Sequence, residues 1–135
     1  MFVELDLQSE TPIYTQLADQ LLAGIASGAL RPGDPLPSVR SLAADLGINL
    51  HTVNKAYQVL KQEGFLQVHR KRGVVINPDG MPGVTAAFQD RLRHQLRGMA
   101  AEAAVRGMSQ EELAELCRSV YDEIRQSGEG GNRDE

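Results

Sequence analysis

The spacing of three residues in the N-terminal half constrains the fold more than any other feature. Ala43, Gly47 and Val53 stand four and six positions apart. Two helices that cross at a tight turn need a small residue in the first helix, so that their backbones can approach. They also need a residue that tolerates positive φ at the turn and an apolar residue that seats the second helix. The three residues meet these needs in order, and the sequence therefore predicts a helix-turn-helix.

Cap residues and helix breakers divide the segment that precedes this motif. We expect Thr11 to cap a first helix, with Pro12 at its first position, because threonine is a good N-cap and proline is tolerated there. Gly28 stands where a C-cap glycine would end that helix. Residues 30–37 contain three prolines, so we expect a rigid loop there and no helix.

Two further helices and a hairpin complete the N-terminal part. Ser38 is expected to cap the first helix of the motif, and Asn49 to cap a second helix that covers about residues 50–63. Two apolar runs, 65–68 and 73–76, are typical of strands, and a basic turn joins them into a hairpin. The order helix, helix, turn, helix, hairpin predicts a winged helix-turn-helix.

The C-terminal part is predicted to be two helices that lack a core of their own. A turn-rich linker leads into a helix over about 85–106, and a capping box formed by Ser109 and Glu112 opens a second helix. Each helix carries one apolar stripe that needs cover, so we expect the hairpins of two chains to pair in a homodimer. The expected dimerisation residues are Phe88, Leu92, Leu96, Met99, Leu113, Leu116, Val120 and Ile124.

The charge of the chain is unevenly distributed. The formal net charge is −4, which by itself argues against a nucleic-acid partner. Residues 36–76, however, carry six basic and two acidic residues, a net charge of +4. Because attraction to phosphate is local and is screened beyond ~10 Å, this basic stretch favours binding of double-stranded DNA despite the total charge.

The composition excludes several other classes of protein. The single cysteine, Cys117, allows neither an intrachain disulfide nor a four-cysteine zinc site, and we expect it to be a buried free thiol, with a redox sensor as the alternative. The histidines and the cysteine show no metal-ligand spacing, and no nucleophile has a recognisable base, so neither a metal, a cofactor nor an enzyme is expected. Without a signal peptide or a spanning segment, the chain is expected to be soluble, cytoplasmic and free of the membrane.

The loop and the helix-turn-helix together resemble a known family. Residues 30–43 resemble the signature loop and second helix of GntR-type bacterial transcription regulators, as do 52–57 and 63–64. The opening residues 12–14 and the short tail are similar to the YtrA-like subfamily. The resemblance implies a dimeric repressor that binds a palindromic operator, often of a transporter operon. It leaves a small-molecule effector open.

The sequence departs from the family pattern at three places. Lys71 stands at the first glycine position of the wing and Val75 replaces the usual aromatic residue, which makes the wing tip more basic. Val39 and Ser41 replace the acidic chemistry at the start of the second helix. His51 stands where the subfamily commonly has asparagine, so the base preference at this position is open.

Exposed residues at the start of the third helix are the expected readers of the major groove. His51 can bond a base edge or a phosphate, Asn54 can pair with adenine in two ways, and Lys55 is expected to contact a phosphate. Thr52 can bond a phosphate, touch a thymine methyl group or bond its own backbone. Arg40 is expected to contact DNA, with base or phosphate unresolved, and Ser38 to cap its helix, donate to a phosphate, or both.

The hairpin tip supplies the remaining contacts. Arg70, Lys71 and Arg72 are expected at the minor groove or along the backbone, and Gly73 at a bend. The alternative for the three cations is a charged turn that protects an edge strand. The complete set of expected DNA-binding residues is Ser38, Arg40, Leu50, His51, Thr52, Asn54, Lys55, Arg70, Lys71, Arg72 and Gly73.

The predicted fold is mainly α with a small β-hairpin. Residues 1–77 form the winged helix-turn-helix DNA-binding domain, 78–84 the linker, 85–127 the helical dimerisation region, and 128–135 a disordered tail. Two other functions remain open. One is a winged helix whose basic face binds an acidic protein partner, and the other is a fragment of an enzyme. The tail contains no lysine that could hold a cofactor of the aminotransferase type, which disfavours the second.

Overall fold

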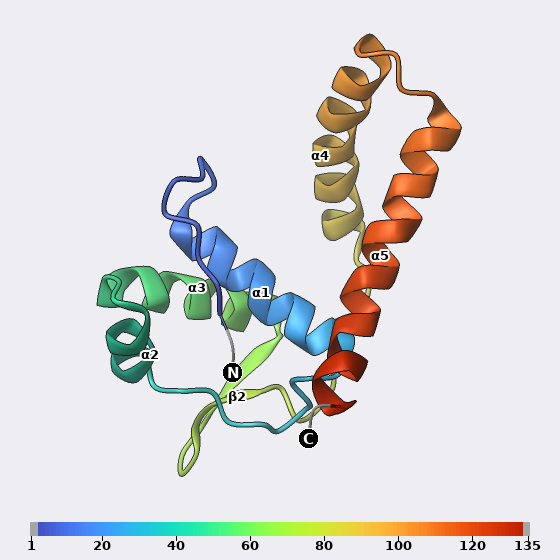
Figure 1. The fold of residues 1–135 in the computed structure, drawn as a ribbon. Helices are drawn as coiled ribbons and strands as arrows, with labels where there is room; N and C mark the ends of the chain where they lie inside the picture. Colours follow the sequence, from blue (N-terminus) through green and yellow to red (C-terminus); the bar gives the residue numbers. More distant parts are fainter. Residues whose placement is uncertain (1–2, 134–135) are drawn as a thin grey trace.

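The computed structural model describes the backbone of residues 3–133 and the side chains of residues 3–126. Within this range the chain forms five helices and one antiparallel pair of strands (Figure 1). The mainly helical winged helix-turn-helix, followed by a two-helix hairpin, is therefore confirmed. The elements are α1 (Ile13–Ser27), α2 (Val39–Leu46), α3 (Leu50–Glu63), β1 (Leu66–His69), β2 (Gly73–Ile76), α4 (Ala86–Val105) and α5 (Gln110–Arg133).

Local capping chemistry sets the helix-turn-helix, as the sequence predicts. The Ser38 hydroxyl accepts a hydrogen bond from the Ser41 amide at 3.0 Å, and the Asn49 side chain accepts one from the His51 amide at 2.7 Å. Between the two helices Gly47 adopts φ 67°, a left-handed conformation that is open to glycine at little cost. The turn therefore lets α2 and α3 pack against each other.

The start of α1 differs from the prediction. Pro12 is the N-cap and α1 begins at Ile13, while the Thr11 side chain makes no cap. The first-turn amides of Thr15 and Gln16 instead donate to the Pro12 carbonyl oxygen, both at 3.1 Å. The prediction of Thr11 as the cap was wrong by one position, because the proline ring fixes the φ angle at which the chain enters the helix.

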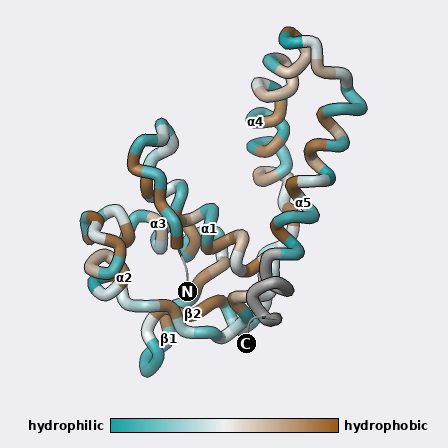
Figure 2. Tube along the Cα trace, viewed as in Figure 1, coloured by the Kyte–Doolittle hydropathy of each residue, from teal (hydrophilic) through white to brown (hydrophobic). Residues whose placement is uncertain are grey.

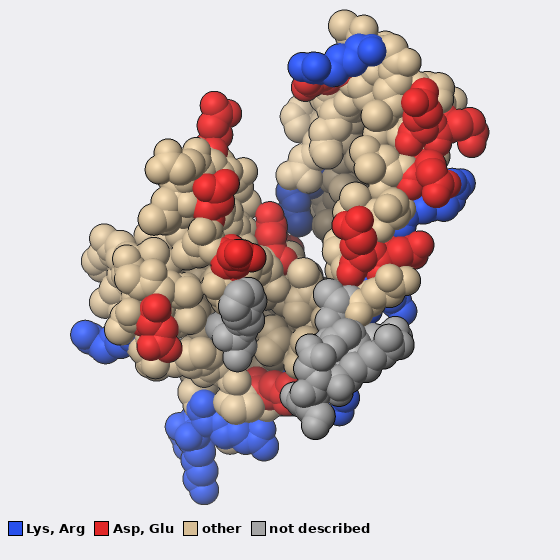
Figure 3. Space-filling view, in the orientation of Figure 1, with Lys and Arg blue, Asp and Glu red and all other residues tan. Residues whose placement is uncertain are grey.

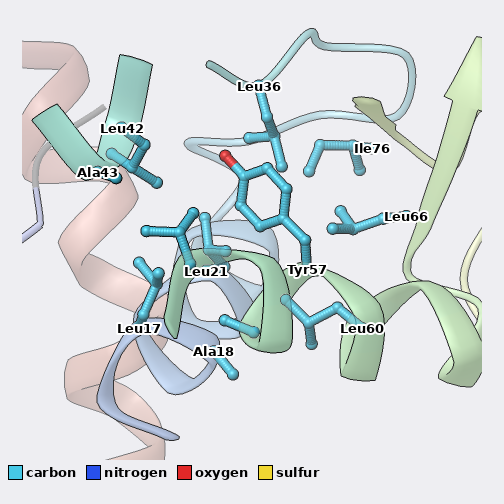
Figure 4. Close-up of a cluster of buried hydrophobic side chains, with 12 residues drawn as sticks. Leu17, Ala18, Leu21, Leu36, Leu42, Ala43, Tyr57, Leu60, Leu66 and Ile76 are labelled. Carbon is cyan, nitrogen blue, oxygen red and sulfur yellow. The ribbon is translucent and has the colours of Figure 1, made fainter. Parts of the chain in front are cut away.

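The hydrophobic core lies where α1, α2, α3 and the strands meet. Figure 4 shows Tyr57 and Leu60 of α3 pointing toward Leu66 and Ile76 of the strands, with Leu17 and other residues of α1 on the other side. The buried set is Leu17, Ala18, Leu21, Leu36, Leu42, Ala43, Val53, Ala56, Tyr57, Leu60, Leu66, Val75 and Ile76. The fully buried core of the winged helix thus consists of aliphatic side chains and alanines around one aromatic ring, that of Tyr57.

The proline-containing loop pairs with the hairpin and extends the wing. The Leu36 amide donates to the Val74 carbonyl oxygen at 2.9 Å, and the Ile76 amide donates to the Asp34 carbonyl oxygen at 2.9 Å. Pro35 forms a bridge to Val75. The sequence predicts a rigid loop here but not this pairing, which covers the outer edge of β2.

The C-terminal helices form an open hairpin. In Figure 1, a loop joins α4 and α5 at their upper end, where the two ribbons are farthest apart, and α5 passes beside the end of α1, on which it packs. The capping box is confirmed, since Glu112 N donates to Ser109 Oγ at 3.1 Å and Ser109 N donates to Glu112 Oε1 at 3.0 Å. α4 contains no buried residue.

The end of α5 lies beyond the expected position near residue 127. The helix continues to Arg133, because an established helix adds residues cooperatively and glycine weakens it without forbidding it. The expected disordered tail, 128–135, therefore overlaps the helix, and residues 134 and 135 lie outside the described residues.

Candidate nucleic-acid interface

One face of α3 is exposed along its first two turns. Val53, Ala56 and Tyr57 point into the core, whereas His51, Asn54, Lys55 and Gln58 are exposed on the opposite side. Successive residues of a helix are offset by ~100°, so these four side chains form one continuous surface. Three of them were predicted as DNA contacts.

Gln58 is a candidate that the sequence reasoning missed. It lies four residues after Asn54 and seven after His51, which places it on the same helix face one turn further along. Its side chain is exposed and carries both a donor and an acceptor. The helical spacing from His51 is the signal that could have identified it.

Two other residues of α3 that were predicted to contact DNA are half-buried. Leu50 is half-buried and packs against the core cluster. Thr52 is also half-buried, and its amide donates to the Asn49 carbonyl oxygen at 3.0 Å in the first helical turn. Both residues therefore present less side chain to a ligand than His51 does.

The residues expected on α2 stand beside this surface. Ser38 and Arg40 are exposed, and the Ser38 hydroxyl oxygen is already engaged by Ser41. Arg40 borders a shallow hollow together with Gly47 and Leu50, between α2 and the start of α3. The guanidinium can thus reach a ligand that lies against α3.

The wing carries the densest group of cations on the face in Figure 3, where blue side chains gather at the tip of the hairpin. The His69 Nδ1 atom accepts hydrogen bonds from the Lys71 and Arg72 amides at 3.2 and 3.3 Å and closes the turn. Gly73 adopts φ 76°, which agrees with the bend expected there. Arg70 and Lys71 are exposed at the tip.

Arg72 has a structural partner that the sequence does not reveal. Its Nη1 atom donates to the Gly33 carbonyl oxygen at 2.9 Å, which ties the wing to the proline-containing loop. One side of the guanidinium therefore serves to fix the wing. The wing cations that are exposed without such a contact in the described part of the chain are Arg70 and Lys71.

A buried tyrosine links the α3 surface to the loop that precedes α2. Tyr57 is 1% exposed, and its hydroxyl donates to the Pro37 carbonyl oxygen at 2.8 Å. Burial raises the pKa of the Tyr57 phenol to about 12, because an ionised phenol would be poorly solvated there. The ring packs in the core, and the hydrogen bond ties α3 to the residue that precedes the N-cap of α2.

The predicted dimerisation residues lie mostly on open surface. The exposed fraction is 40% for Leu92, 45% for Leu96 and 60% for Met99 on α4, and 51% for Leu116 on α5. Phe88 and Val120 are also exposed, Leu113 is half-buried, and hydrophobic segments follow both helices in Figure 2. Ile124 is exposed as well, and it also borders a pocket with residues of α1.

Two side chains of the hairpin, Cys117 and Arg91, have surroundings that the sequence does not predict. Cys117 is exposed, so the prediction of a buried thiol was wrong, because α4, which has no buried residue of its own, does not cover it within one chain. The Arg91 Nη1 atom lies 3.4 Å from Glu63 Oε1, and the guanidinium lies over the Phe88 ring. Arg91 thus connects α4 to the last residue of α3.

Other kinds of site find little support in the described residues. No group of three or more His, Cys, Asp or Glu side chains there could hold a metal ion. None of the helices in that part of the chain is both long and apolar enough to cross a membrane.

Comparison with known proteins identifies relatives that cover most of the chain. The model described as "Bacterial regulatory proteins, gntR family" matches residues 13–76. The HTH-type transcriptional repressor YtrA of Bacillus subtilis is 32% identical over 123 residues, which cover 91% of this chain and 95% of that protein.

Solved structures agree with this relationship. YtrA from Sulfolobus acidocaldarius, described as a GntR-family transcription factor, is 41% identical with a TM-score of 0.54, over 90% of this chain and 98% of that one. A structure from Listeria monocytogenes described as a transcriptional antiterminator has a TM-score of 0.85 at 23% identity, over 93% of both chains, and shows the shared fold alone.

Proposed function

This chain belongs to the GntR family of bacterial regulatory proteins and is a DNA-binding transcription regulator, and we propose that it is a repressor that binds a palindromic operator as a homodimer. The family consists of transcription regulators, so the chain is not an enzyme. The observation that carries the proposal is the exposed α3 face, with His51 and Asn54, beside a wing that presents Arg70 and Lys71.

The proposed division of labour follows the predicted domains. Residues 1–77 bind DNA, 78–84 connect, and 85–127 dimerise. The α3 face reads base edges from the major groove, with Arg40 and Ser38 of α2 at its border. Arg70 and Lys71 contact the minor groove or the flanking phosphates, while Arg72 holds the wing in place.

Dimerisation is supported by the uncovered stripes of α4 and α5. Monomeric proteins rarely leave a long apolar stripe in water, and the hairpin of a second chain offers the same stripe in return. A two-fold dimer carries two identical reading surfaces, which is why a palindromic operator is expected. The relative named as a repressor supports repression, and the resemblance to its subfamily supports a transporter operon as the target.

A junction cavity supports control by a small-molecule effector. The cavity, of about 320 Å³, lies between the winged helix and α4, where Leu22, Phe65 and Phe88 line it beside the Arg91–Glu63 pair. A ligand there would touch the end of α3 and the start of α4 together. A thermal-shift screen of metabolites would find candidate ligands, and a DNA-release assay would test them. A ligand of this cavity should lose its effect on DNA in Val84→Trp, which places a bulky side chain at the cavity wall, but not in Val105→Trp.

Selection from a random duplex pool, combined with pull-down of bound genomic DNA, tests the main proposal. We expect both to return one palindromic sequence upstream of a regulated gene. The alternative of an acidic protein partner, motivated by the same basic surface, predicts binding without sequence preference. A pool that emerges unenriched would therefore contradict the operator and favour that alternative.

A further inference from the structure

We propose that Tyr14 is a positioning residue for DNA binding, which holds Lys55 toward a phosphate at the edge of the major groove. The inference rests on the proposed function, since it assigns a role within the same interface. In this proposal Lys55 of α3 contacts a phosphate, whereas His51, Asn54 and Gln58 contact the bases.

The observation is a contact between α1 and α3. The Lys55 ammonium nitrogen lies 4.1 Å from the centroid of the Tyr14 ring. Attraction between a cation and the electron-rich face of an aromatic ring operates within ~6 Å. Tyr14 is half-buried and packs against the core, so the ring is a fixed support, whereas Lys55 is exposed.

The position of Lys55 around the helix explains the direction in which it is held. With ~100° between successive residues, His51 and Gln58 define the middle of the exposed face of α3. Asn54 lies on one side of this line and Lys55 on the other. The ring contact shows that the Lys55 side is the one that faces α1.

The charge on Lys55 remains available to DNA. Among the described residues no carboxylate lies within ion-pair distance of its ammonium group. A cation seated on a ring keeps N–H groups directed away from the ring, toward solvent or a phosphate. A lysine otherwise loses much side-chain freedom when it binds, so holding it in advance lowers that loss.

The test measures DNA affinity over a series of salt concentrations, with the selected palindrome and a scrambled duplex. Lys55→Ala should weaken binding to both duplexes alike and reduce the salt slope by about 0.9 per protomer, as loss of one phosphate contact requires. Tyr14→Leu should weaken both by about two- to five-fold, the range expected for an exposed cation–ring contact. Tyr14→Phe, which keeps the ring, should bind like the unmodified protein.

Non-additivity decides the proposal. In the Lys55→Ala background, Tyr14→Leu should cause no further loss, because the group that it positions is gone. The same substitution combined with Lys61→Ala, a second lysine of α3, should give additive losses. Additive losses with Lys55→Ala, or a Tyr14→Phe protein as weak as Tyr14→Leu, would overturn the proposal.

A measurement without DNA separates this inference from the proposed function. The Lys55 ε-methylene protons should show an upfield ring-current shift in the NMR spectrum of the free protein, and Tyr14→Leu should abolish it. Tyr14→Met, which has a flexible unbranched side chain and no ring, serves as a second variant if the leucine protein unfolds. A chain that binds all duplexes equally contradicts the operator only, whereas an unshifted Lys55 signal contradicts the positioning role only.

Discussion

The hydroxyl of Tyr57 donates a hydrogen bond to the carbonyl oxygen of Pro37 at 2.8 Å. This bond joins the buried side of the recognition helix α3 to the residue that precedes the N-cap of α2. The two helices are thus related by the Gly47 turn at one end and by a side-chain bond at the other. The bond therefore ties the buried side of α3 to the chain that leads into α2.

Removing this bond should destabilise the fold without changing what the surface reads. Tyr57→Phe leaves the Pro37 carbonyl oxygen with one partner fewer in a poorly solvated place, which costs about 1–2 kcal/mol of unfolding free energy. Urea denaturation should show a lower midpoint with an unchanged slope. Operator preference should be retained; a relaxed preference would mean that the bond also shapes the surface.

The same group predicts a loss of stability at alkaline pH. Tyr57 titrates at about 12 in the folded chain, against 10.0 for a free phenol. Between these values the unfolded chain gives up the proton first, so stability is complete below about pH 10 and falls as pH rises toward 12. The fall amounts to about 3 kcal/mol, and it levels off above the folded pKa.

The comparison that isolates this contribution is the unfolding free energy of Tyr57→Phe over the same pH range. Lysines and other tyrosines titrate in both proteins, but the phenylalanine variant lacks the buried phenol. The difference between the two proteins should shrink from pH 9 to pH 12. Parallel curves would contradict the raised pKa of Tyr57.

Lys71 and Arg72 should give different results although they are adjacent. Lys71 is exposed at the wing tip, so Lys71→Ala should weaken DNA binding and reduce the salt slope by about 0.9 per protomer, with little change in stability. Arg72 also donates to Gly33 at 2.9 Å, so Arg72→Ala should lower the unfolding midpoint by releasing the wing from the loop. Fluorescence anisotropy in a salt series and thermal melts of both variants check the two effects. An Arg72→Ala protein with an unchanged midpoint would show that the Gly33 contact contributes no stability.

Much of the local structure could be predicted because it depends on residues a few positions apart. The caps at Ser38 and Asn49 and the turn at Gly47 lie where the sequence places them. The prediction of a helix boundary was wrong where two neighbouring residues, Thr11 and Pro12, both favour a helix start. Cys117 was predicted to be buried and is exposed. The exposure of a helix residue depends on how closely a second helix packs on it, which the periodicity of apolar residues does not predict.

The contacts that shape the interface were beyond local reasoning. Arg72 and Gly33 are 39 positions apart, and Tyr57 and Pro37 are 20 apart. Such pairs are created by the fold, so a single sequence shows a basic turn and an aromatic residue but not their partners. The roles assigned to His51, Asn54 and Lys55 toward DNA stay predictions, although their exposure on one face agrees with them.

The exposed stripe of α4 leads to the last prediction, that a charge placed in it converts the protein to a monomer. Leu92 lies midway along the stripe with 40% of its surface exposed, and a carboxylate there could not be covered by an apolar partner helix without losing its hydration. Light scattering coupled to gel filtration should show half the mass for Leu92→Asp. The salt slope of operator binding should fall to about half, since one protomer supplies half the phosphate contacts.

Val105→Asp is the matched control for this substitution. Val105 lies on the same helix, is 88% exposed and stands outside the stripe, so its replacement adds the same charge without touching the expected interface. This variant should keep the dimeric mass and the salt slope of the unmodified protein. A dimeric Leu92→Asp protein would contradict pairing through this stripe. A monomeric Val105→Asp protein would indicate that the interface lies nearer the loop that joins α4 and α5.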